Sequence, residues 1–395
     1  MYNQRSPMNP NDKLLTRRVE KVLPSKEGLQ ELLNSGRKIR LYQGFDPTGG
    51  RLHLGHTIGL RKLMDFARLG HEVIFLFGTG TVLVGDPSER DTGRKLITQE
   101  EIDQNIEGWK DQVAPIVDFS KITIKQNGDW LVPLTLKDIV GIASNISAVQ
   151  LFKRESFTRR IEQGDTVWYH ETMYPLLQGY DSVAMDVDLE IGGTDQEFNM
   201  LIGRELQHKM KGRDKFVLTV PMILGTDGGQ MSKTTGNCIW LDDTPEDMFG
   251  KIMSLPDSQI LSYWQLLTDL PLEDLTDLDQ NPLDHKKRLA EDITRQFHGP
   301  DKAHEAADHF HRTVQQKETP DEVEEFSIDR GEHTYLDIIK QANINLSNSE
   351  IKRLAAQGGI KWNGQSITHL NEKFDVGGGE ILQVGKRLFR KAKVD

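Results

Sequence analysis

One continuous apolar run, residues 73–77, constrains the fold of this chain more than any other segment. A strand with apolar side chains on both faces is typical of a parallel sheet that helices cover on each side. Further strands are predicted over residues 39–42, 217–220 and 222–224. Apolar residues at helical spacing over 58–66 predict a helix after the strand over 39–42. Because strands alternate with helices, we expect a doubly wound α/β domain that binds its ligands at the carboxyl ends of the strands.

The chain has 395 residues, which is more than one compact domain usually holds. After about Thr244 the strand patterns disappear, and helical patterns broken by prolines continue to about Val314. Residues 315–325 are acidic and poor in apolar side chains, which is typical of a linker. We therefore expect three parts: a parallel-sheet α/β domain over 1–243, a helical domain over 244–325 and a small α+β domain over 326–395.

The last part contains strong local structure signals. Ser347 and Glu350 have the spacing of a capping box, and Gly358 with the glycine after it predicts the end of the helix that the box begins. Asn363-Gly364 lies between two short apolar segments and predicts a hairpin with a type I′ turn over residues 360–367.

Charge is distributed unevenly along the chain, whose net charge is −11. Residues 334–395 contain ten Lys or Arg and six Asp or Glu, a net charge of +4, so the other 333 residues carry −15. The distribution of charge indicates a nucleic-acid partner better than the total does. The basic tail therefore predicts contact with phosphates, which the acidic body would repel.

Composition also indicates the compartment. The single cysteine, Cys238, excludes an intramolecular disulfide and suits a reducing environment. No apolar run approaches the roughly 20 residues that span a bilayer, and the first residues lack the pattern of a targeting signal. We expect a cytoplasmic protein without a membrane partner.

The segment His53-Leu54-Gly55-His56 follows the first predicted strand and a turn rich in Gly and Pro. Histidines at i and i+3 share one face of a helix, and at a helix N-terminus that face attracts anions. Such a pair stabilises the charge that develops on a phosphate during nucleotidyl transfer. Gly55 would allow a flat base to approach the backbone.

A second segment, residues 228–234, is a glycine-rich loop that contains Met231, Ser232 and Lys233. A mobile lysine in such a loop supplies a point charge for a triphosphate. The loop is not a Walker P-loop, because Ser232 stands where that motif has glycine.

A third pattern places Tyr174, Gln178 and Asp181 on one face of a predicted helix. A phenol, an amide and a carboxylate in line can bind an ammonium at one end and a hydroxyl at the other.

Together, the first two motifs resemble HIGH and KMSKS, the two signatures of the class I aminoacyl-tRNA synthetases. The resemblance extends through most of residues 35–245, and the helix pattern followed by Gly-Gly-Thr-Asp-Gln at 192–196 is similar to the tyrosyl enzymes. One departure is Gln230, which replaces the first lysine of KMSKS, whereas Lys233 matches the second. Arg90 and Arg94 lie in a loop that contacts ATP in the family, and they would compensate for the missing lysine.

The resemblance implies a Rossmann-like catalytic domain that joins L-tyrosine to tRNA(Tyr) at the expense of ATP. It implies Mg²⁺ bound through ATP, no metal ligated by the protein, and a homodimer formed by an insertion at about 115–165. Its catalytic residues would be His53, His56 and Lys233. The tyrosine site would comprise Tyr42 and Asp181 for the phenol, Asp86, Tyr174 and Gln178 for the ammonium, and Gln196 near the carboxylate. The ATP site would comprise Asp46, Thr48, Gly55, Thr81, Arg90, Arg94, Gly193, Asp195, Met231, Ser232 and Lys233.

The tail resembles a small RNA-binding module, named after a ribosomal protein, that many bacterial tyrosyl enzymes carry. Its basic residues would contact tRNA phosphates, and a second basic run lies where the family's insertion meets the acceptor end. The tRNA-binding residues implied are Lys153, Arg154, Lys352, Arg353, Lys361, Lys386, Arg387 and Arg390.

Two alternatives remain open at this point. A tryptophanyl synthetase shares the fold, although it has no use for a tyrosine and an aspartate that bind a phenol. An RNA-binding protein descended from a synthetase would have lost catalysis with the change to Gln230, but it would not need the HLGH segment or the amino-acid pocket.

Overall fold

The computed structural model describes residues 11, 14–86, 97–231, 235–315, 323–342, 344, 346–385 and 388–394. The chain divides into two compact units, Met1–Pro300 and Asp301–Asp395.

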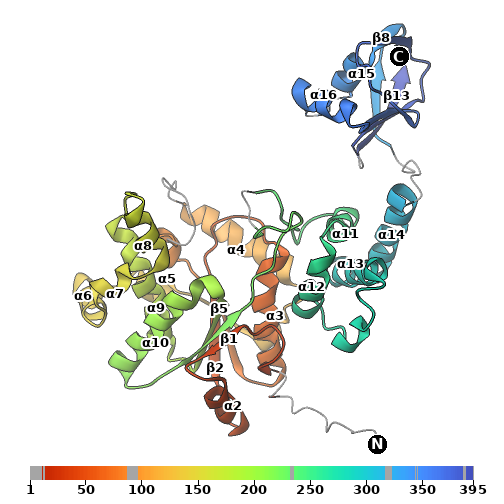
Figure 1. Ribbon diagram of the computed structural model, residues 1–395. Coiled ribbons are helices and arrows are strands. Elements are labelled where there is room, and N and C mark those ends of the chain that lie inside the picture. Colours follow the sequence, from red (N-terminus) through yellow and green to blue (C-terminus); the bar gives the residue numbers. More distant parts are fainter. Residues whose placement is uncertain are drawn as a thin grey trace, which may run out of the picture. The chain divides into compact units, whose positions relative to one another are not determined.

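A six-stranded sheet forms the centre of the described part of the first unit (Figure 1). Its strands lie in the order β1-β6-β5-β2-β3-β4, and all neighbours are parallel except the edge pair β1 and β6. The chain builds outward from β2 through β3 to β4 and then returns to the other side of β2 with β5 and β6. The order therefore reverses between β2 and β5, the place where α/β sheets bind ligands. The strands are β1 Lys21–Leu23, β2 Arg40–Phe45, β3 Glu72–Phe77, β4 Thr123–Gln126, β5 Leu189–Gly193 and β6 Phe216–Val220.

The predicted Rossmann-like parallel sheet is confirmed, and so are three of its four predicted strands. The apolar run over 73–77 is buried throughout in β3, as expected of a strand covered on both faces. The fourth prediction, a strand over 222–224, is wrong. Pro221 has no N–H to donate to a ladder, and of these residues Leu224 makes an isolated bridge with Gln230.

Helices cover the sheet, and α9 and α10 pack closely against each other beside β5 (Figure 1). The two helices approach closely because both have glycine at the crossing: a Cβ on Gly179 would lie 3.0 Å from the amide nitrogen of Gly203. The α-helices up to this point are α2 Lys26–Asn34, α3 Leu54–Arg68, α4 Gln99–Val113, α5 Gly128–Leu131, α6 Leu136–Ala143, α7 Ala148–Phe152, α8 Glu155–Glu162, α9 Tyr174–Met185 and α10 Glu197–Lys211.

The predicted change to helices after Thr244 is confirmed. Thr244 caps the first of these helices, and three of the four begin with proline, whose missing N–H is not needed there. They are α11 Pro245–Met253, α12 Ile260–Leu267, α13 Pro282–His298 and α14 Pro300–Phe310. Because α11 to α13 belong to the same compact unit as the sheet, a separate helical domain over 244–325 stays a prediction.

The second unit has its own apolar core, to which Ile338, Ile351, Trp362 and Leu382 contribute. A five-stranded sheet has the order β10-β9-β12-β13-β7, and β8 pairs with β11. The elements after α14 are β7 Glu325–Ile328, β8 Glu332–Thr334, α15 Tyr335–Gln341, α16 Asn348–Ala356, β9 Ile360–Trp362, β10 Gln365–Ser366, β11 Lys373–Asp375, β12 Ile381–Val384 and β13 Leu388–Val394.

The local predictions for this unit are confirmed. Ser347 and Glu350 form the capping box of α16. Asn363 and Gly364 both have positive φ, 45° and 80°, as a type I′ turn requires. Most of the predicted linker lies outside the described residues, and its last residue, Glu325, already belongs to β7.

Among the described residues, no helix combines the length and the apolar character that crossing a membrane requires.

Candidate active site

Most of the predicted site residues gather at the carboxyl ends of three neighbouring strands. Asp46 directly follows β2, Thr81 lies in a short turn of helix after β3, and Gly193 ends β5. Because these strands are neighbours in the order β5-β2-β3, the three residues meet at one edge of the sheet.

His53 and His56 lie at the start of α3, where His53 is the N-cap and His56 the third helical residue. The amide N–H of His53 donates to Nδ1 of His56 over 3.1 Å, and the centroids of the two rings lie 3.9 Å apart. Nδ1 also lies 3.2 Å from the carbonyl oxygen of His53. That oxygen already accepts from the amide N–H of His56 over 3.0 Å, whereas the His53 N–H can only donate. We therefore assign Nδ1 as an acceptor, which places the proton of the neutral imidazole on Nε2, a donor. A Cβ on Gly55 would lie 3.0 Å from the His53 ring, so glycine here makes room for an imidazole.

The carboxylate of Asp46 connects two other predicted residues. Thr81 donates its hydroxyl to Oδ1 of Asp46 over 2.7 Å, and Tyr174 donates to Oδ2 over 3.0 Å. A Cβ on Gly78 would overlap Oδ1, so this position needs glycine. Thr48 donates its amide N–H to the carbonyl of Asp46, which closes the turn after β2.

Helix α9 carries the three residues predicted to select tyrosine: Tyr174, Gln178 and Asp181. Asp181 is the most buried of the three, with 2% of its surface exposed. The indole N–H of Trp130 donates to Oδ1 of Asp181 over 2.8 Å, and the amide of Asn127 donates to Oδ2 over 3.0 Å. Burial raises the pKa of Asp181 well above its ordinary value, while these two donors oppose that shift. Trp130 and Asn127 were not predicted, although Asn127 directly follows β4 and Trp130 lies in α5 just after it, where the same strand-end rule applies.

A chain of amides connects this face to Asp86. Asn199 donates to the side-chain carbonyls of Gln178 and Gln196, each over 2.9 Å, and Gln196 donates to Oδ2 of Asp86 over 2.7 Å. Asn199 is fully buried and was also not predicted. Gln196 further donates to Asp195 over 3.0 Å.

Arg154 was predicted to contact tRNA in the same basic run as Lys153, but its side chain is buried. Its side chain is 5% exposed, and Nη2 lies 3.3 Å from Oδ1 of Asp86. A charge removed from water needs such a partner. We therefore reassign Arg154 to the candidate active site and keep the exposed Lys153 as the predicted tRNA contact.

Four predicted ATP residues, Arg90, Arg94, Ser232 and Lys233, lie outside the described residues. The start of the second motif loop is ordered by Asn237, which donates to Asp227 over 2.8 Å and to the carbonyl of Gln230 over 3.0 Å. Met231 is buried beside it.

The predicted tRNA residues of the tail have different surroundings. Lys352 and Arg353 are exposed on α16, and Lys361 is partly exposed on β9. Arg390 lies 2.5 Å from the carboxylate of Glu324. Lys386 and Arg387 lie outside the described residues.

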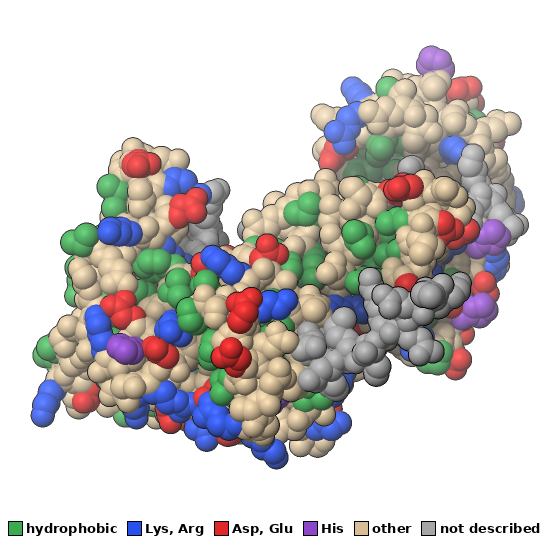
Figure 2. Space-filling model, turned by 60° about the horizontal axis from the view of Figure 1, so that its bottom comes forward, with side chains coloured by type: hydrophobic (Ala, Val, Ile, Leu, Met, Phe, Trp, Pro, Cys, Tyr) green, Lys and Arg blue, Asp and Glu red, His purple; other side chains and the backbone are tan. Residues whose placement is uncertain are grey.

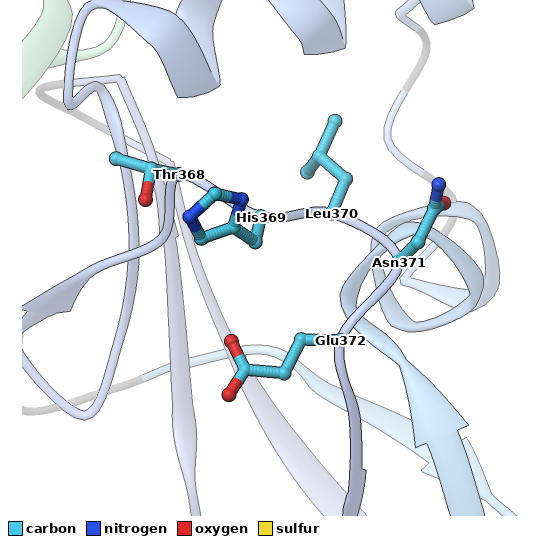
Figure 3. A pocket seen from close by; sticks show the side chains of 5 residues that line it. All are labelled: Thr368, His369, Leu370, Asn371 and Glu372. Carbon is cyan, nitrogen blue, oxygen red and sulfur yellow. The ribbon is translucent and has the colours of Figure 1, made fainter.

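A surface hollow in the second unit offers less chemistry than this site. Figure 3 shows that its five side chains, Thr368 to Glu372, come from a single loop. Among the described residues, no group of three or more His, Cys, Asp and Glu side chains could hold a metal ion.

Comparisons with known proteins agree with this geometry. Residues 34–315 match the family model of the class I tRNA synthetases for tryptophan and tyrosine. The tyrosine–tRNA ligase of Thermotoga maritima is 39% identical over 392 residues, which cover 97% of each chain. That of Geobacter metallireducens is 40% identical over 385 residues, 94% of each. The solved tyrosyl-tRNA synthetase of Archaeoglobus fulgidus, complexed with L-tyrosine, shares the fold with a TM-score of 0.61 at 24% identity, and the match covers 76% of this chain and all of that one.

The family model matches well over half of the chain, and the curated relatives match nearly all of it. By these matches the chain belongs to the class I tRNA synthetases and, among them, to the tyrosine–tRNA ligases.

Proposed function

We propose that this chain activates L-tyrosine with ATP to form tyrosyl-adenylate and then transfers the tyrosyl group to the 3′ end of tRNA(Tyr). The observation that carries the proposal is the buried carboxylate of Asp181, held by Trp130 and Asn127 next to Tyr42. An aspartate whose oxygens are fixed in this way suits the hydroxyl of a phenol. A site with such buried polar groups rejects an amino acid that lacks the hydroxyl, a rule for which the tyrosyl enzymes are themselves a standard example.

In the first step, the carboxylate of tyrosine attacks the α-phosphate of ATP, and pyrophosphate leaves. No side-chain nucleophile is required, so positioning and charge stabilisation carry the step. We assign the stabilisation of the pentavalent phosphate to His53, His56 and Lys233, with Mg²⁺ bound through the ATP phosphates. The Nε2 donor of His56, at the positive end of α3, supports this role.

The remaining site residues are assigned by their neighbours. Asp86, Tyr174 and Gln178 would bind the α-ammonium, and the link from Gln178 through Asn199 to Gln196 and Asp86 supports a common role. Gln196 would lie near the carboxylate of the substrate. The ATP residues would be Asp46, Thr48, Gly55, Thr81, Arg90, Arg94, Gly193, Asp195, Met231 and Ser232.

In the second step, a hydroxyl of the terminal ribose attacks the acyl carbon, and AMP leaves. We propose that the part of the chain over 326–395 binds the tRNA through Lys352, Arg353, Lys361, Lys386, Arg387 and Arg390, with Lys153 near the acceptor end. The helical part over 244–325 would lie on the anticodon side. Because tRNA charging supplies protein synthesis, and because a chain with the single cysteine Cys238 forms no intramolecular disulfide, we place the protein in the cytoplasm.

A homodimer is the assembly we propose. Residues 132–169 expose many apolar side chains, and Figure 2 shows apolar groups among the charged ones on the surface of the first unit. Leu136 is 78% exposed and Tyr169 83% exposed, which a contact with a second copy would cover. Light scattering should therefore give twice the chain mass of 44.9 kDa, and a single-chain mass would contradict the dimer.

Pyrophosphate exchange into ATP tests the proposed function directly. The purified protein should exchange with tyrosine and not with tryptophan or phenylalanine. Exchange with tryptophan would favour the tryptophanyl alternative. If the protein bound tRNA but exchanged with none of the three, it would be the RNA-binding protein without catalysis.

Replacing Asp181 with alanine should erode the preference for tyrosine over phenylalanine. A hydrogen bond to a charged group contributes about 1.5–3 kcal/mol, which corresponds to roughly 10- to 150-fold in the ratio of kcat/KM for the two amino acids. Asp129→Ala is a matched control, because Asp129 is an exposed carboxylate on the segment that carries Trp130. Unchanged discrimination in Asp181→Ala would show that the phenol binds elsewhere.

A further inference from the structure

A buried ion pair lies directly behind the proposed phenol site. Lys215 donates to Oε2 of Glu190 and to the hydroxyl of Ser182. The Ser182 hydroxyl lies 2.9 Å from the hydroxyl of Tyr42. Each of these four side chains is at most 2% exposed, so none of them exchanges its partners with water.

The fold brings these four residues together from separate elements. Tyr42 and Glu190 are register partners on the parallel strands β2 and β5, which are neighbours in the central sheet (Figure 1). Their side chains therefore lie on the same face of the sheet. Ser182 comes from α9, and Lys215 directly precedes β6. A Cβ on Gly203 of α10 would lie 2.7 Å from Nζ of Lys215, so the ammonium fits only because this residue is glycine.

The number of protons available in this cluster indicates which groups donate hydrogen bonds and which accept them. The ammonium of Lys215 only donates, so the oxygen of Ser182 accepts from it and has a single proton to give. Two oxygens lie within reach of that proton: Tyr42 at 2.9 Å and Oε2 of Glu190 at 3.3 Å. Hydrogen bonds between oxygens are best near 2.7–2.8 Å, and Oε2 already accepts from Lys215. Of the two acceptors, Oε2 of Glu190 and the hydroxyl of Tyr42, we therefore assign the proton of Ser182 to Tyr42.

With its oxygen accepting from Ser182, Tyr42 has its own proton to offer, and Glu190 is the partner for that proton until a substrate hydroxyl takes its place. Burial and the nearby carboxylates of Glu190 and Asp181 raise the pKa of Tyr42 well above its ordinary value, so the phenol keeps that proton. Asp181, in turn, offers acceptor oxygens. One donor next to one acceptor matches a group that both accepts and donates a single hydrogen bond, which is a hydroxyl.

We infer that Lys215 and Ser182 are positioning residues for tyrosine selection, which orient the hydroxyl of Tyr42 as a donor to the hydroxyl of the substrate. The inference rests on the proposed function, in which Tyr42 and Asp181 bind the phenol of tyrosine. It adds that the chain distinguishes a hydroxyl from other polar groups of similar size at the same place on the ring.

An aromatic amine separates this inference from a purely structural role. In 4-aminophenylalanine the nitrogen donates two hydrogen bonds but accepts poorly, so the Tyr42 donor finds no partner. The variant Ser182→Ala removes the proton that orients the Tyr42 hydroxyl and leaves the ion pair intact. The double variant Lys215→Met with Glu190→Gln removes both charges of the pair, so no unpaired charge remains buried. In both variants Tyr42 is free to turn its proton away and accept from the amine.

Exchange kinetics of the full chain with tyrosine, 4-aminophenylalanine and phenylalanine provide the measurement. Both variants should lower the preference for tyrosine over the amine about tenfold, the effect of one hydrogen bond. The KM for ATP should stay unchanged, and most of the preference over phenylalanine should remain because Asp181 is present. The matched control is Lys209→Met with Glu205→Gln, which removes a partly exposed pair on α10.

Each other outcome has a definite meaning. If the preference over the amine is unchanged in variants that keep the wild-type Tm, the inference is wrong and the pair only stabilises the fold. Should the double variant fail to fold, Ser182→Ala decides alone. If Asp181→Ala also keeps its preference for tyrosine over phenylalanine, it is the proposed phenol site that is wrong, and not only the orientation of Tyr42.

Discussion

Replacing His56 with alanine should slow the formation of tyrosyl-adenylate by about 10²–10³-fold, with little change in the KM for tyrosine. The imidazole lies in the first turn of α3, and its Nε2 proton is directed by the bond that Nδ1 accepts from the His53 amide. A donor that meets the phosphate only when charge develops there raises kcat and not substrate affinity. Single-turnover measurement of adenylate formation at saturating tyrosine and ATP reports this rate.

Two further variants separate the chemical role of His56 from its role in capping the helix. The variant His56→Asn places a side-chain carbonyl where Nδ1 accepts, so it keeps the cap but not the donor that reaches the phosphate. His56→Gln extends an amide toward the position of Nε2. We expect His56→Asn to be as slow as His56→Ala and His56→Gln to recover part of the rate. A wild-type rate in His56→Asn would mean that the residue only caps α3.

A chain that ends at Gln315 should exchange pyrophosphate at close to the full rate but charge tRNA about 10²-fold less efficiently at physiological salt. The match to the family model ends at the same residue. The apolar core of the tail contains only residues from Phe326 onward, so its removal leaves the proposed tyrosine and ATP sites intact. Tyrosine-dependent exchange and tRNA charging, measured on the same shortened protein, test both parts of the prediction.

The full-length variant Lys352→Gln with Arg353→Gln is the control for this deletion. Both residues are exposed on α16, so the double change removes charge and keeps the core of the tail. It should weaken tRNA binding and reduce the slope of log affinity against log salt concentration by about two. Intact charging after the deletion would give the tail another role, and a collapse of exchange would make it part of the catalytic fold.

Local signals in the sequence were sufficient for much of the fold. The buried run of β3, the capping box at Ser347 and the Asn363-Gly364 turn depend on neighbours along the chain, and all three were predicted correctly. The short strands β1 and β4 and the unpredicted β5 depend on pairing with distant strands. The segment after Pro221 has the composition of a strand but no partner strand in the described chain.

Site residues that belong to a family motif could be predicted from the sequence. Residues that only the fold brings next to them could not. Asn199 donates to Gln178, Trp130 donates to Asp181, and the ammonium of Lys215 lies over the ring of Tyr42. In the sequence, each of the three would pass for an ordinary polar residue. Arg154 shows the opposite error, because a basic run suggests a surface and only the structure reveals the partner carboxylate of Asp86.

The pairing of β13 with β7 sets an order of events during synthesis on the ribosome. Strand β7 is the first strand of the tail sheet along the chain, but its partner, β13, is made only after the other strands of that sheet. The tail sheet therefore cannot close until β13 has emerged from the ribosome, whereas the sheet of the first unit is complete with β6. Since domains generally fold from the N-terminus as the chain emerges, a nascent or prematurely terminated chain would have a folded first unit and an unfinished tail. With the role proposed for the tail, such incomplete chains would not withdraw tRNA from finished enzyme.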